Sequence, residues 1–246
     1  MRSLNNLLLA AGLTMATSAT IATPIKTALN YSNSYSTEDR HLTGFNAVSV
    51  SGSFDVYITQ GSTESVKVDA PSNVIDRIIT EVKGGVLNIY IKNNNGINWS
   101  WGKNNKMIVY VSIKNVNAVS LSGSGDVFFK DGLKATSLKL KVVGSGDISG
   151  KLDVKDLESS VSGSGDITVS GRAETSNVSV IGSGDFTGQS LATTNTSVRV
   201  AGSGDARVNA AEKIDASVTG SGDIHYTGAA RNISSSKAGS GSVSRM

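Results

Sequence analysis

From His41 onward the chain alternates apolar and polar residues as β-strands do, and one turn signature interrupts the alternation at a nearly constant interval. The tetrapeptide Gly-Ser-Gly-Asp occurs six times and is followed by a seventh copy, Gly-Ser-Gly-Ser; the copies begin at Gly123, Gly144, Gly163, Gly182, Gly202, Gly220 and Gly239. The steps between them are 21, 19, 19, 20, 18 and 19 residues. Such a period predicts a solenoid in which each repeat is one coil and neighbouring coils bury each other's apolar faces.

The phase of the alternation predicts which side chains face the core. Both glycines of each motif share their phase with the flanking apolar residues, which are Val161, Val180, Val200 and Val218 before the motif and Ile167, Phe186, Ala206 and Ile224 after it. Because successive side chains of an extended chain point to opposite sides, we expect the glycines inside and Ser and Asp outside. A Cβ at the glycines would collide with the core or with a neighbouring coil. One coil is predicted as strand, Gly-Ser-Gly-Asp corner, strand and looser second corner.

An internal match places the first third of the chain in the same solenoid. Residues 46–56 align with residues 117–127, with nine of eleven positions identical. Phe54 replaces the second glycine there, and we expect it to plug the N-terminal end of the core. The strands between the two copies are interpreted as further coils with larger loops, and the segment after Pro71 predicts at most a turn or two of helix.

The N-terminal residues have the layout of a secretory signal peptide, with Arg2, an apolar run over residues 7–13 and small residues up to Ala22. Ala19 and Ala22 are both suitable cleavage points. We therefore predict a signal peptide at 1–22, a polar linker at 23–40 and a β-helix domain at 41–246. No later segment has the roughly 20 apolar residues needed to span a membrane. The mature protein is expected in the periplasm, at the cell surface or secreted.

Composition excludes several classes of site. The chain has no Cys, which rules out disulfides, thiolate metal sites and cysteine nucleophiles. It has two histidines, His41 and His225, and we expect His225 to be a surface residue instead of a base. The formal net charge is +3 and the basic residues are scattered, so nucleic acid is not expected as a partner.

Stacking the coils would create a column of aspartates about 4.8 Å apart. They are Asp126, Asp147, Asp166, Asp185, Asp205 and Asp223. One interpretation is a row of cation sites, with calcium held by carboxylate and hydroxyl oxygens. The other, which we favour, is structural: each Asp accepts hydrogen bonds from its own corner or from the Ser of the next coil.

Trp99 and Trp101 lie in an Asn-rich loop over residues 93–105. They could form a stacking surface for a glycan or a surface protein. Alternatively they cover the N-terminal coils. Eleven of the 13 aromatic residues precede Lys130, so an aromatic recognition surface is expected at that end.

Catalysis is not predicted, since a paired acid and base need carboxylates in different environments and the Asp column offers near-equivalent ones. We therefore expect a non-enzymatic binding or structural module of the cell envelope. The alternatives are a β-helix enzyme acting on a polysaccharide and a calcium-stabilised scaffold.

The motifs at 45–56 and 82–89, together with the repeated Gly-Ser-Gly-Asp, resemble the bacterial family called putative autotransporter adhesin, head GIN domain. The resemblance implies an all-β fold, a single-stranded right-handed parallel β-helix with about 19 residues per coil, and a role in adhesion. A left-handed β-helix has a similar coil length, but the six-residue apolar beat typical of it is absent. After Gly239 no membrane barrel or coiled-coil stalk is expected. The final coil would present an open strand edge through which the protein could self-associate.

Overall fold

The computed structural model describes residues 34–92 and 106–246, and the statements below refer to them. The strands are β1 (Tyr35–Asp39), β2 (Ala47–Gly52), β3 (Asp55–Gln60), β4 (Ser65–Pro71), β5 (Ile78–Lys83), β6 (Val86–Ile91), β7 (Ile108–Ile113), β8 (Ala118–Gly123), β9 (Asp126–Gly144), β10 (Asp147–Gly163), β11 (Ile167–Gly182), β12 (Phe186–Gly202), β13 (Ala206–Gly220), β14 (Ile224–Thr227), β15 (Asn232–Gly239) and β16 (Val243–Arg245). A short 3₁₀ turn, η1 (Ile75–Arg77), precedes β5. Within the described part of the chain no helix is long and apolar enough to cross a membrane.

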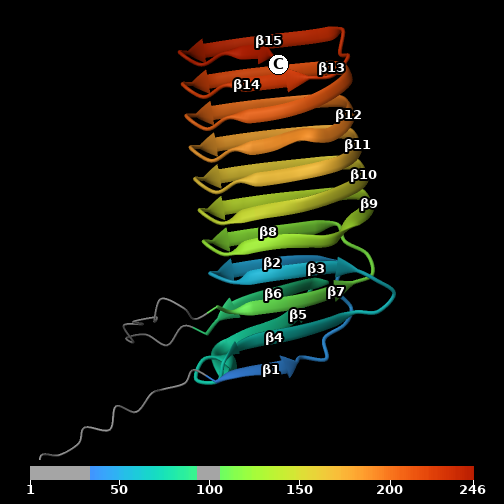
Figure 1. The fold of residues 1–246 in the computed structure, drawn as a ribbon, viewed down its shortest axis with the longest axis vertical. Helices are drawn as coiled ribbons and strands as arrows, with labels where there is room; N and C mark the ends of the chain where they lie inside the picture. The colour runs from blue at the N-terminus through green and yellow to red at the C-terminus, as the bar shows by residue number, and fades with distance from the viewer. Residues whose placement is uncertain (1–33, 93–105) are drawn as a thin grey trace, which may run out of the picture. The chain divides into compact units, whose positions relative to one another are not determined.

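From β8 onward the chain winds into stacked parallel coils, which Figure 1 shows as a ladder of ribbons from green to red. Strands β9 to β13 are 15 to 19 residues long because each continues around its coil from one Gly-Ser-Gly-Asp corner to the next. The register joins equivalent residues of successive repeats, so that Gly163 pairs with Gly144 on one side and with Gly182 on the other. The predicted all-β solenoid with about 19 residues per coil is confirmed.

The glycines of the motif lie against the backbone of the preceding coil. A Cβ on Gly165, the second glycine of its motif, would lie 2.1 Å from the carbonyl oxygen of Gly146. A Cβ on Gly163, the first glycine, would lie 2.3 Å from the carbonyl oxygen of Gly144, and Gly163 also has a φ of +128°. The second glycine is therefore required for space, and the first for both space and backbone conformation.

Each coil bends at a third place, which the prediction of two corners per coil did not include. In β10 the side chains of Lys155 and Asp156 are both exposed, while Val154 before them and Leu157 after them are buried. A straight strand alternates strictly, so two successive outward side chains mark a bend. Similar outward doublets occur in the neighbouring coils at residues 136–137, 174–175 and 194–195. The coil therefore has three legs, and the two-corner prediction is wrong.

The early copy of the motif belongs to the same stack, as the internal match predicts. Gly52 pairs with Gly123 and Asp55 with Asp126. Phe54 is fully buried, but it does not end the core, because β6 pairs with the other side of β2 and β7 with the other side of β3. The core continues beyond this coil.

The segment between the two copies differs from the predicted series of coils. Strand β4 pairs with β7 and β5 pairs with β6, both antiparallel, and β1 is also antiparallel to β4. Figure 1 shows these strands below β2 and β3. Strand β1 also lies inside the segment 23–40 that the sequence predicts as a polar linker. The last residues of that segment therefore form part of the sheet.

The last coil carries polar residues at two positions where the preceding coil has buried apolar ones. Ser235 pairs with Ala216 and Lys237 pairs with Val218, although Ala216 and Val218 are buried. Every residue of β15 is exposed. A lysine on the inward phase of an edge strand opposes pairing with another edge. Self-association through this coil stays a prediction, and Lys237 weighs against it.

Candidate functional site

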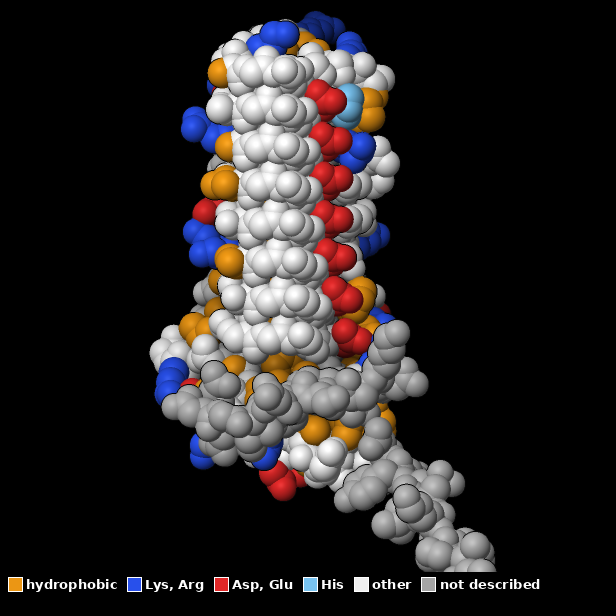
Figure 2. Space-filling model, turned by 90° about the vertical axis from the view of Figure 1, so that its left-hand side faces the viewer, with side chains coloured by type: hydrophobic (Ala, Val, Ile, Leu, Met, Phe, Trp, Pro, Cys, Tyr) orange, Lys and Arg blue, Asp and Glu red, His pale blue; other side chains and the backbone are white. Residues whose placement is uncertain are grey.

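The motif aspartates form one column along the surface, seen as the red line in Figure 2. It contains the six predicted residues, Asp126, Asp147, Asp166, Asp185, Asp205 and Asp223. The early copy extends the column, because Asp55 pairs with Asp126. Stacking by the repeat alone therefore brings these carboxylates together.

A chain of hydrogen bonds runs along this column. From Asp147 to Asp223, the backbone N–H of each motif aspartate donates to Oδ1 of the aspartate in the preceding coil, with N···O distances of 2.7 to 3.3 Å. The N–H of Asp126 donates to the Phe54 carbonyl instead. At the last corner Ser242 replaces Asp, and both its N–H and its hydroxyl donate to Asp223 Oδ1 at 2.8 Å. For the carboxylates from Asp126 to Asp205 the donor is thus the backbone N–H of the next coil's aspartate, which was not one of the predicted donors. Asp223 alone among the six accepts from a serine of the next coil. Each aspartate links two coils through a charge-assisted hydrogen bond.

The electrostatics of the column vary along its length. Burial raises the pKa of Asp126, whereas the hydrogen bonds from Ser242 lower the pKa of Asp223. Arg207 lies 3.7 Å from an Asp205 carboxylate oxygen and 3.9 Å from one of Asp185. Among the described residues, no three His, Cys, Asp or Glu side chains converge as a metal site requires. Calcium binding by the column stays a prediction, and the hydrogen bonds give the carboxylates a structural role without it.

A second feature is a groove created by the third bend of each coil. It has a volume of about 940 Å³ and crosses β9, β10, β11 and β12, reaching the loop before β8 at Asn115 and β13 at Ala211. At the usual strand spacing of about 4.8 Å, four steps from β9 to β13 give a length of about 19 Å. A groove that crosses several coils in this way is long enough to hold a segment of an extended polymer.

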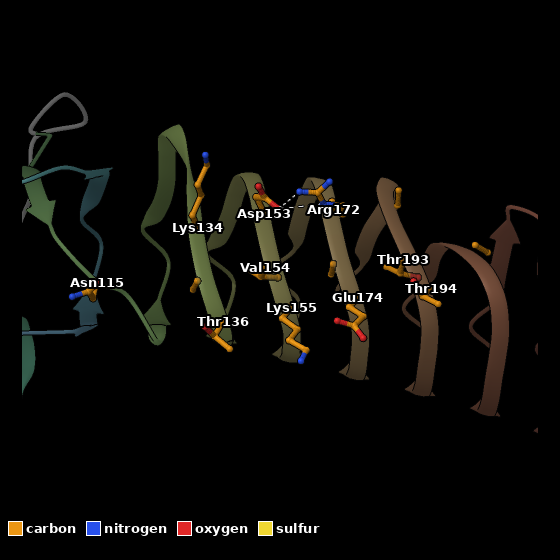
Figure 3. A pocket seen from close by; sticks show the side chains of 14 residues that line it. Asn115, Lys134, Thr136, Asp153, Val154, Lys155, Arg172, Glu174, Thr193 and Thr194 are labelled. Carbon is orange, nitrogen blue, oxygen red and sulfur yellow. Dashed lines mark hydrogen bonds and ion pairs between the residues drawn. The ribbon is translucent and has the colours of Figure 1, made fainter.

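Two rows of polar side chains form the walls of the groove, as Figure 3 shows. One row is Lys134, Asp153 and Arg172, and the other is Thr136, Lys155, Glu174 and Thr194. Between the rows the lining consists of smaller side chains, namely Ala135, Val154, Ala173 and Thr193. The walls therefore offer both signs of charge over a narrow, partly apolar floor.

Local contacts hold the walls in place. Arg172 Nη2 lies 2.8 Å from Asp153 Oδ1, and this hydrogen bond lowers the pKa of Asp153. The side-chain amide of Gln60 accepts from the backbone N–H of Lys134 at 2.7 Å and donates to its carbonyl at 2.9 Å. At the far end the buried Thr193 hydroxyl donates to the Asn209 carbonyl at 2.6 Å. The groove is thus supported by side chains of its own and adjacent coils.

Arg172 lowers the pKa of Asp153, so this carboxyl group does not suit the role of a general acid, which needs a raised pKa. The groove as a whole offers groups for contacts with a ligand. Its charged side chains can form ion pairs and hydrogen bonds with a ligand, and its floor can contact apolar surface.

The remaining sequence predictions fall elsewhere. Trp99 and Trp101 lie outside the described residues. The His225 ring contacts Ser244 through Nδ1 at 2.9 Å and is half-buried beside the Asp column. The groove was not predicted. Its signal in the sequence is the set of polar doublets at 136–137, 155–156, 174–175 and 194–195, which break the alternation once per coil.

Comparison with known proteins identifies the family. The profile of the family described as "putative auto-transporter adhesin, head GIN domain" matches residues 44–230, which is most of the chain. The chain belongs to this head GIN domain family. The resemblance carried by the motifs at 45–56 and 82–89 and by the repeated corner is thereby confirmed.

Solved structures of similar proteins share the fold. A putative adhesin from Bacteroides fragilis is 26% identical with a TM-score of 0.81, over 87% of this chain and 98% of that one. A putative adhesin from Parabacteroides distasonis is 25% identical with a TM-score of 0.71, over the same shares of the two chains. A protein from the same organism described as a putative lipid binding protein is 25% identical with a TM-score of 0.68, also over 87% and 98%. The chain matches no protein of the curated set.

Proposed function

We propose that the protein is a non-enzymatic, adhesin-like binding module of the cell envelope, and that an extended polymer lies in the groove. The observation that carries the proposal is the groove itself, because it crosses several coils and has charged walls on both sides. Membership of an adhesin family supports a binding role at the cell surface. The signal peptide predicted at 1–22 supports export, and the domain predicted at 41–246 would be the exported module.

The polymer is a glycan or an extended segment of a surface protein. Both present repeated polar groups at intervals of a few ångströms, which suits walls whose charges recur once per coil. The alternation of Lys134 with Asp153, and of Lys155 with Glu174, favours a ligand that carries hydroxyl or amide groups over a uniformly charged polymer. The Trp99/Trp101 loop is a second contact region in this proposal.

An array of glycans and matrix proteins, probed with purified residues 23–246, tests the proposal. Specific retention of one ligand class is expected. Each retained ligand is then incubated with the protein and analysed for shortened products. Intact ligand supports a binding module. Steady product release would instead establish the polysaccharide enzyme, and an array without any signal would leave a scaffold role in its place.

A further inference from the structure

A column of aromatic side chains lies on the outer face of the sheet where β7, β3 and β9 meet. The register places Tyr110 beside Tyr57 and Tyr57 beside Phe128. The ring centroids of Tyr57 and Tyr110 are 5.6 Å apart and those of Tyr57 and Phe128 are 5.1 Å apart, with 20° between the ring planes in both pairs. Tyr110 is 43% exposed, so the column is open to solvent on its outer side.

The repeat does not require aromatic residues at these positions. In the next coils the equivalent positions carry Ser149, Thr168 and Thr187. Those coils form equally regular parallel strands without an aromatic side chain there. Cross-strand stacking explains why the rings lie parallel. It does not explain why this end of the sheet has large amphipathic side chains on an exposed face.

The aromatic column borders a hollow that is lined by cations. The hollow has a volume of about 450 Å³, and its lining includes Lys67, Lys130 and the hydroxyl groups of Thr59 and Ser65 beside the two tyrosines. Lys130 Nζ lies 4.2 Å from the centroid of the Tyr57 ring. Lys130 therefore lies against the Tyr57 ring at the edge of the hollow, and Tyr110 is the more exposed ring.

The polar groups of the hollow have few partners within the protein. In the described part of the chain, the Tyr57 and Tyr110 hydroxyls have no hydrogen-bond partner, and Lys67 and Lys130 are in no ion pair. No carboxylate lines the hollow. Asp55 lies two residues before Tyr57, away from the lining, and is already paired with Lys106 at 3.4 Å. The hollow is therefore a cationic site with aromatic and hydroxyl groups.

We propose that this hollow binds a glycan that carries carboxylate groups, such as a polymer of uronic acids. A sugar ring presents an apolar C–H face that packs on an aromatic side chain, and its hydroxyl groups can bond to the two tyrosine hydroxyls. The ring carboxylate pairs with Lys130 and Lys67, neither of which forms an ion pair of 4 Å or less within the described residues, although the register places Asp39 opposite Lys67. The site is separate from the groove and independent of the function proposed for it.

Isothermal titration of residues 23–246 with tetragalacturonate tests the proposal, with maltotetraose as the neutral sugar and inorganic phosphate as the simple anion. The first variant, Lys67→Gln/Lys130→Gln, removes both charges. The second, Tyr57→Thr/Tyr110→Thr, introduces the residue type that later coils carry at this position. The matched control, Lys141→Gln/Lys151→Gln, removes two exposed lysines that do not line the hollow. Circular dichroism establishes that each variant is folded.

Tetragalacturonate is expected to bind the parent protein and the control alike, with affinity that falls as salt is added. Each hollow variant is expected to lose about tenfold or more in affinity. Equal affinity for maltotetraose, or competition by phosphate at equal concentration, would overturn the assignment to an acidic sugar. Failure of the parent protein to bind, or identical losses in the control, would overturn the site. Binding in the groove is tested separately, because the substitutions that test it change wall residues of the groove and no residue that lines the hollow.

Discussion

Replacing the second glycine of a central motif by alanine should destabilise the solenoid strongly. In Gly165→Ala the new methyl group would lie 2.1 Å from the Gly146 carbonyl oxygen and 2.9 Å from Val142 Cγ1. Gly165 has no positive φ, so the effect is steric. The main obstacle is backbone, which cannot move aside as a flexible side chain can.

The size of the effect follows from the contacts that must change. Overpacking a core typically costs about 1 to 3 kcal/mol when side chains can adjust. Here the two coils must separate locally, which strains the hydrogen bonds from the Ser164 and Gly165 N–H groups to the Gly144 carbonyl, 2.8 and 3.0 Å long. We therefore expect a loss of about 3 kcal/mol in the free energy of unfolding, at the upper end of that range. For a domain of this size that corresponds to a fall of about 6 to 12 °C in Tm.

Urea and thermal unfolding followed by circular dichroism measure this loss. Ser164→Ala is the matched control, because Ser164 is the exposed neighbour within the same motif and should change stability by no more than about 0.5 kcal/mol. If Gly165→Ala unfolded at the same urea concentration and temperature as the Ser164→Ala control, the close approach of the coils at this corner would be refuted.

Four further predictions concern the aspartate column and the loop that carries Trp99 and Trp101. Hydrogen bonds from Ser242 lower the pKa of Asp223, so the ionised carboxylate stabilises the folded protein above the ordinary aspartate pKa. This stabilisation is lost as the pH falls through the pKa that Asp223 has in the folded protein. Asp223→Asn should therefore be less stable than the parent protein at pH 7, and unfolding curves recorded at falling pH should show the difference shrinking. Burial raises the pKa of Asp126, so its ionised carboxylate destabilises the folded protein at pH 7. Asp126→Asn should therefore leave the free energy of unfolding unchanged or increase it at pH 7, and any increase should vanish as the pH falls. Millimolar calcium or a chelator should leave Tm unchanged, because the column already accepts backbone hydrogen bonds, whereas a rise in Tm with calcium would restore the cation sites. Trp99→Ala/Trp101→Ala should weaken binding of an array-selected ligand without changing Tm. A large fall in Tm would instead show that the loop covers the N-terminal coils.

The regular part of the fold was predictable because its signals are local. The two-residue alternation fixes which face each side chain takes, so it placed the motif glycines inside and the aspartates in an outer column. The internal match placed residues 46–56 in the same stack as residues 117–127, although it was not used to add Asp55 to the column. The hydrogen-bond donors of the column could not be read in this way, because they depend on the exact offset between coils.

The irregular parts required pairing information that one sequence does not contain. Nothing local indicates that β7 pairs with β3 or that β4 runs antiparallel to β7. The aromatic column follows from that pairing, since it brings Tyr110 beside Tyr57. The third bend did have a local signal, the polar doublets such as Lys155-Asp156. The bend was missed because these doublets follow the glycine of the second corner by only a few residues, and charged residues there are equally typical of one loose corner. The groove beside the bend was therefore not predicted either.

The most direct test of binding in the groove is an affinity comparison for the array-selected polymer. The variant Lys155→Glu/Glu174→Lys exchanges two wall charges without changing the net charge. Lys139→Glu/Glu158→Lys is its control, because it exchanges a surface ion pair of 2.6 Å that lies outside the groove. Binding in the groove predicts that the first variant loses about tenfold or more in affinity while the control binds like the parent protein. Equal affinity in all three proteins would contradict it.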